Sequence, residues 1–224
     1  MVALFIALMF IGFVLVDVVV QRLAARRALA AVAAPQVWDV PRGFFLSEGH
    51  TWSCRDSSAG VRVGADALLP HALGAVKKVV PPKPGELVKA GQPLFRLENQ
   101  GCELEVPSSI AGRVVALNPD LGKRPELVAE DPYGSGWICA IAPTRSNGGH
   151  AKLRSGNQAQ AWLEQEFHRF REFLSLQISP DRALNVTYPD GGLPALGSLA
   201  QLRRSAWRAF EEEFLRPRTG PPTP

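Results

Sequence analysis

Cysteine and histidine are scarce in this 224-residue sequence, and the common catalytic and metal-binding motifs are missing. Its three cysteines stand apart, without a CxxC pair, and are too few for a disulfide framework. Its four histidines show none of the spacings that bind zinc, and the sequence has neither a phosphate-binding loop nor a nucleophile–base arrangement. We therefore expect no catalytic residue, no metal site and no enzymatic activity.

Strong charge of either sign is also missing. The net charge is only +4, and the basic residues do not form a stripe interleaved with aromatic side chains. This pattern argues against binding to nucleic acid. With 46% hydrophobic and 21% charged residues, the chain has the composition of a folded protein.

One long apolar run opens the sequence. Residues 2–20 contain a single charge, Asp17, and as a helix they would span about 28 Å, enough for a hydrocarbon core. No basic residue precedes the run, whereas Arg22, Arg26 and Arg27 follow it at once, which favours an uncleaved anchor over a signal peptide. The positive-inside rule predicts an inner-membrane protein with its N-terminus outside and its globular part in the cytoplasm. Asp17 has two open interpretations: a carboxylate that reaches the interface, or a polar contact with another transmembrane helix.

Proline and glycine divide the remainder into short apolar runs, and then two helical patterns follow. The short runs are typical of a sandwich or barrel. Leu163, Phe167, Phe170 and Leu174 are spaced as one apolar helix face after a capping box at Ser155, and a second helix is expected from Ser198. We predict an anchor (1–21), a juxtamembrane helix and linker (22–42), a β-sandwich (43–143), a helical extension (144–215) and a disordered tail (216–224).

Four motifs give the sandwich region a family resemblance. Residues 49–52 read GHTW, residues 63–66 read VGAD, residues 125–128 read PELV and residues 130–137 read EDPYGSGW. In this order they resemble the glycine cleavage system H protein over residues 43–143. The resemblance implies a mainly β fold, a lipoyl/biotinyl-type barrel-sandwich hybrid, here preceded by one transmembrane helix and followed by a two-helix extension.

The sequence departs from that family at the position that matters most. H proteins carry a lipoyl group on a lysine that lies three residues after a glutamate and eleven before a glycine. Glu98 and Gly112 are retained here, but Gly101 occupies the lysine position, and no lysine lies between Lys89 and Lys123. Glycine has no amine for the lipoyl amide, so we expect no cofactor. The chain then resembles a membrane-anchored subgroup that lacks the lipoyl lysine.

The other candidate residues have simple structural interpretations. His50 is expected to be packed and hydrogen-bonded beside Trp52, and residues 130–134 to form a turn and not a metal loop. Acidic neighbours disfavour a reactive thiolate at Cys102.

The arginines at 203, 204 and 208 have two open interpretations, a solvated helix face or a docking or headgroup patch. Aromatic and arginine side chains together are typical of an interface core and rim. The candidate interface residues are Asp17, Trp162, Phe170, Arg203, Arg204, Trp207 and Arg208.

These features predict a non-enzymatic docking subunit of a larger integral membrane complex, respiratory or photosynthetic, bound to the bilayer through residues 2–20. One alternative is a lipoyl-carrier-like protein of glycine cleavage or related one-carbon metabolism. Another is an adaptor for a small ligand.

Overall fold

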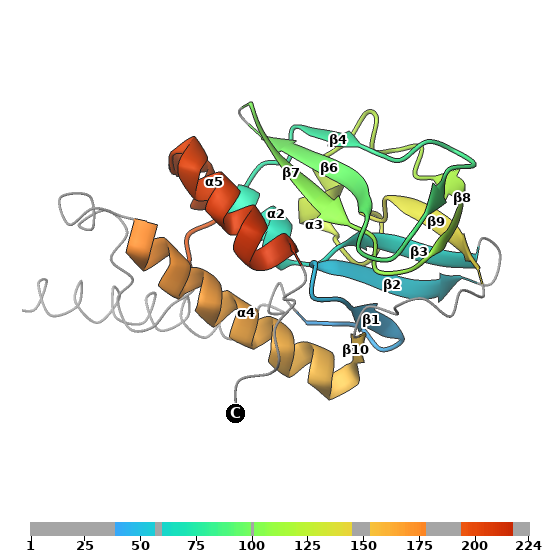
Figure 1. The fold of residues 1–224 in the computed structure, drawn as a ribbon, viewed down its shortest axis with the longest axis horizontal. Helices are drawn as coiled ribbons and strands as arrows, with labels where there is room; N and C mark the ends of the chain where they lie inside the picture. The colour runs from blue at the N-terminus through green and yellow to red at the C-terminus, as the bar shows by residue number, and fades with distance from the viewer. Residues whose placement is uncertain (1–38, 57–59, 100, 145–152, 178–193, 217–224) are drawn as a thin grey trace, which may run out of the picture. The chain divides into compact units, whose positions relative to one another are not determined.

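The computed structural model describes residues 39–56, 60–99, 101–144, 153–177 and 194–216 (Figure 1). The predicted anchor at residues 2–20, Asp17, the juxtamembrane stretch and the tail beyond residue 216 lie outside these ranges. Within the ranges described, no helix is both long and apolar enough to cross a membrane.

A seven-stranded antiparallel sheet forms the larger layer. Its order is β10-β1-β2-β3-β9-β8-β5, so the late strand β10 closes the edge beside β1, the first strand. The strands are β1 (Phe44–Leu46), β2 (Thr51–Asp56), β3 (Gly60–Ala65), β5 (Leu87–Val88), β8 (Gly112–Leu117), β9 (Cys139–Pro143) and β10 (Arg154–Ser155).

A three-stranded antiparallel sheet forms the second layer. It contains β4 (Lys78–Val80), β6 (Pro93–Asn99) and β7 (Cys102–Pro107), with β6 in the centre. Leu97, Leu104 and Val106 point inward and are fully buried, whereas Glu103 and Glu105 alternate with them on the exposed face. This period-two pattern gives each strand one core face and one solvent face. The predicted mainly β sandwich is confirmed.

Two short helices, α2 (Leu68–Leu73) and α3 (Leu127–Glu130), complete the core. The Asp66 carboxylate accepts a hydrogen bond from the Leu68 amide at 3.0 Å, which fixes the turn from β3 into α2. Trp52 is buried, and its indole N–H donates to the Pro132 carbonyl at 2.9 Å. The segment at 130–137 is therefore a structural turn that holds the tryptophan of the opening motif.

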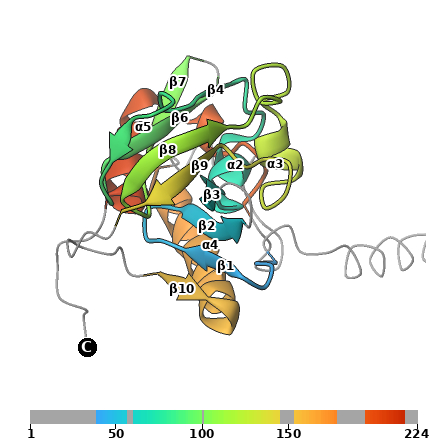
Figure 2. The same cartoon turned by 90° about the vertical axis from the view of Figure 1, so that its right-hand side faces the viewer.

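The helical extension is only partly as predicted. Helix α4 (Gly156–Gln177) buries Leu163, Phe167, Phe170 and Leu174, as their spacing indicated, and lies beside β1 and β10 (Figure 2).

The second predicted helix is broken into the 3-10 turn η3 (Leu199–Gln201), α5 (Arg204–Phe210) and the π-helical turn η4 (Glu211–Leu215). Ser198 makes no side-chain cap, and Leu202 is extended, so the single helix expected from Ser198 is wrong.

Candidate functional site

The hairpin between β6 and β7 is the place where the family resemblance predicts function. Asn99 pairs with Cys102, so the loop has only two residues, and its second residue, Gly101, has φ +76°. Such a left-handed turn favours glycine because an L-residue is strained there. The Asn99 side-chain amide donates to the Leu73 carbonyl at 2.7 Å and fixes the base of the hairpin on α2.

The residues of this hairpin do not fit a lipoyl group. Open space surrounds the position where a Cβ would stand on Gly101, but the residue offers no amine for the amide bond. The retained Glu98 pairs with Lys78 of β4, whose ammonium lies 2.9 Å from the carboxylate. A Cβ on Gly112 would collide with the Ala142 carbonyl of β9, so this glycine is required by strand packing. The hairpin, Glu98 and Gly112 are all present, and Gly101 stands at the position where the resemblance predicts the lipoyl lysine.

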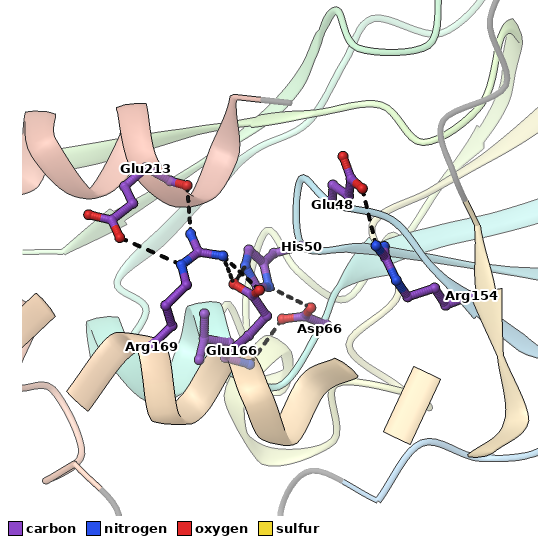
Figure 3. Close-up of polar contacts among 8 residues, drawn as sticks. Glu48, His50, Asp66, Arg154, Glu166, Arg169 and Glu213 are labelled. Carbon is purple, nitrogen blue, oxygen red and sulfur yellow. Dashed lines mark hydrogen bonds and ion pairs between the residues drawn. The ribbon is translucent and has the colours of Figure 1, made fainter. Parts of the chain in front are cut away.

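A second polar group lies inside the domain, centred on His50 (Figure 3). His50 is completely buried, its Nδ1 lies 2.8 Å from the Asp66 carboxylate, and its Nε2 lies 3.5 Å from that of Glu166. Burial opposes protonation of the imidazole, but the two carboxylates outweigh it and raise the pKa of His50 to about 9. Burial also acts to raise the pKa of Glu166, yet its partners His50 and Arg169 lower it overall.

Arg169 extends this group to the end of the extension. Its guanidinium binds the Glu166 carboxylate at 2.7 and 2.5 Å and donates to the Glu213 carbonyl at 2.7 Å. It also lies 4.2 Å from the centre of the Phe214 ring. The network fastens the turn before β2 to α4 and η4, and His50 within it has no exposed surface. This network was not predicted from the sequence, although Glu166 and Arg169, three residues apart on an otherwise apolar helix face, could have indicated it.

The predicted interface residues fall into three groups. Trp162 is half-buried and stacks on His50, with ring centroids 5.1 Å apart. Phe170 and Trp207 are buried within this chain, Phe170 in a cluster with Phe173, Phe210 and Phe214. The exposed group comprises Arg203, Arg204 and Arg208. The aromatic side chains of the extension thus largely cover one another.

Comparison with known proteins identifies the family. The family model of the glycine cleavage H-protein matches residues 45–166. The glycine cleavage system H protein of Thermus thermophilus is 34% identical over 128 residues, which are 57% of this chain and 98% of that protein. That of Mycobacterium bovis is 36% identical over 103 residues, 46% of this chain and 77% of that protein. A crystal structure of the Mycobacterium marinum H protein matches with a TM-score of 0.49 and 25% identity, over 56% of this chain and 99% of that one.

These matches correct the predicted function. The expectation of a docking subunit in a respiratory or photosynthetic membrane complex is wrong, because the relatives are named glycine cleavage system H proteins. They favour the carrier-like alternative instead. The matched region also reaches past the sandwich into α4 and includes Glu166. This chain belongs to the glycine cleavage H-protein family.

Proposed function

We propose that this chain is a non-catalytic H-type protein of glycine cleavage or a related branch of one-carbon metabolism. The observation that carries this proposal is the retained two-layer sandwich with its β6–β7 hairpin, within a family match over residues 45–166. A carrier of this family is handled by enzymes and catalyses nothing itself. Recognition by those enzymes is therefore the activity to test.

The absence of an amine at Gly101 limits the functions that the hairpin can perform. An arm at the tip of the hairpin requires a lysine, and Gly101 has no side chain. We infer that the protein binds the proteins that handle H-type domains without carrying a lipoyl group at this hairpin. Intact mass of the full-length protein, isolated from its own cells, tests this point. A mass increment equal to one lipoyl amide on any lysine would contradict this inference and support the full carrier function.

Binding is measured by calorimetry with the other purified proteins of the glycine cleavage system. The Glu103 carboxylate is exposed on the outer face of β7, next to the hairpin tip. We expect Glu103→Lys to weaken binding about tenfold, because it reverses a charge at the contact. The control is Glu172→Lys, at an exposed position of α4. Absence of binding by the unmodified full-length protein, or equal effects of the two reversals, would contradict the proposal.

We propose in addition that residues 2–20 anchor the chain in the inner membrane, with the N-terminus outside and the remainder in the cytoplasm. The length of this apolar run and the arginines that follow it support the orientation. A reporter that works only in the cytoplasm, fused to the C-terminus, should be active, and deletion of residues 2–20 should release the fusion from the membrane fraction. Activity of a periplasmic alkaline phosphatase fusion at the same site would overturn the orientation.

A further inference from the structure

Strand β7 is one of the two edge strands of the three-stranded sheet, and the C-terminal extension covers its edge. In Figure 1, α5 runs alongside β7, and both α5 and η4 pack against that strand. The contact is specific, because the Glu105 amide of β7 donates to the Glu211 carboxylate at 3.1 Å. An open strand edge is a template for pairing with another chain, and a helix laid against it removes that template.

The covering segment, residues 194–215, is attached to the sandwich where it begins. The ring Nε2 of His71 donates to the Pro194 carbonyl at 2.7 Å, and the Gly197 amide donates to the His71 carbonyl at 2.9 Å. Gly74 and Gly197 pack so closely that a Cβ on Gly74 would lie 2.8 Å from the Gly197 Cα. These contacts fix the segment on α2, the helix that also holds the base of the hairpin through Asn99.

The segment is attached again where it ends. Arg169 of α4 binds the Glu213 carbonyl and lies over the Phe214 ring. Between the two attachments Trp207 and Phe210 are buried, so the cover has an apolar core of its own. The family match ends at residue 166, and residues 194–215 therefore lie beyond the part that this chain shares with the family model.

We propose that residues 194–215 are an intramolecular cover that restricts access to the β6–β7 hairpin along the β7 edge. The inference rests on the proposed function, in which enzymes that handle H-type domains address this hairpin. Such an enzyme must displace residues 194–215 before it can bind β7. The chain thereby limits recognition at the same hairpin from which the lipoyl lysine is missing.

A lysine introduced at the tip of the β6–β7 hairpin makes access to the hairpin measurable. Gly101→Lys in the full-length protein supplies an amine. A lipoate–protein ligase first joins lipoate to ATP as lipoyl-AMP with release of pyrophosphate, and the lysine amine then displaces AMP and loses a proton to form the amide. The initial rate is followed by intact mass. The same reporter is combined with Glu211→Ala, which removes the acceptor of the Glu105 amide, or with Glu212→Ala, the matched control at the exposed neighbouring position.

We expect Glu211→Ala to raise the ligation rate about tenfold, because loss of a hydrogen bond to a carboxylate favours local opening. The control should leave the rate unchanged. Faster hydrogen exchange of the Glu105 amide would show independently that the cover is loosened. Glu211→Gln repeats the test with a smaller change in side-chain size.

Equal ligation rates in all variants would contradict the proposed cover. It would also be contradicted if no variant were ligated while hydrogen exchange of the Glu105 amide rises. The readout needs only the ligase and the introduced lysine. Failure of the proposed function, seen as no binding to glycine cleavage proteins, therefore remains a separate result.

Discussion

His50 shows how a buried charge is made tolerable in this domain. Its backbone has φ 57°, which is uncommon for a residue other than glycine, and its side chain lies between two carboxylates with no exposed surface. A buried ionised group is stable only when it is paired and hydrogen-bonded. Asp66 supplies the hydrogen bond at Nδ1, and Asp66 and Glu166 together supply the opposite charge.

The raised pKa of His50 makes stability depend on pH. Because the pKa rises from 6.5 to about 9 on folding, the stabilisation is fully present below pH 6.5 and is lost as the pH rises through about 9. The shift corresponds to roughly 3 kcal/mol at most. Urea unfolding at pH 6.5 and pH 9.5 measures this loss, and His50→Gln should flatten the dependence. An equal slope in wild type and variant would contradict the assignment.

Gly64 packs tightly against the ring of Trp52. A Cβ on Gly64 would lie 2.6 Å from the Trp52 ring, which is buried and held by the Pro132 carbonyl. We expect Gly64→Ala to lower the free energy of unfolding by about 1–3 kcal/mol through overpacking. Gly122→Ala is the matched control, since nothing lies within 4 Å of its Cβ position. Denaturant titration of both variants should separate them.

Helix α4 could be predicted from the sequence, whereas the structure of residues 194–215 could not. The apolar positions of α4 repeat over several turns and all face the core, so their spacing alone predicts the helix. After Ser198 the chain is shaped by neighbours, because Gly197 fits against Gly74 and the next turn ends at the extended Leu202. Local patterns cannot report a constraint that another element imposes.

Arg169 joins two of these elements and should be costly to remove. Arg169→Ala leaves the Glu166 carboxylate without one of its two cationic partners and frees the Glu213 carbonyl. With the guanidinium partly exposed, we expect a loss of about 2 kcal/mol in unfolding free energy. Arg208→Ala, at an exposed position, should change it by less than about 0.5 kcal/mol. Similar losses in both variants would argue against the network.

For the whole molecule, the family and the two-layer sandwich could both be predicted from ordered motifs. The contact between Glu105 and Glu211 could not, because these residues lie 106 positions apart and meet only once the C-terminal extension packs on β7. The same holds for His50 and Glu166. Sequence patterns show which faces are apolar, whereas the partners of polar groups depend on tertiary register.

The extension also protects apolar surface of the whole domain. Phe170 and Phe173 of α4 pack against Phe210 and Phe214, and all four are buried. Deletion of residues 194–224 should expose this cluster, lower the melting temperature and increase binding of a hydrophobic dye. Deletion of residues 217–224 alone is the control. A truncated protein with unchanged melting and dye binding would show that the cluster is not needed.

The pairing of β10 with β1 has a consequence for synthesis on the ribosome. The first strand of the domain acquires its outer neighbour only when residues 154–155 are made, and the buried His50 acquires Glu166 later still. Contacts of such high sequence separation form late and slowly. A nascent chain that has emerged only as far as β9 can therefore pair His50 with Asp66 but not with Glu166, and its β1 edge lacks β10. The contacts that η4 makes with β7 form only after residue 215 has left the exit tunnel.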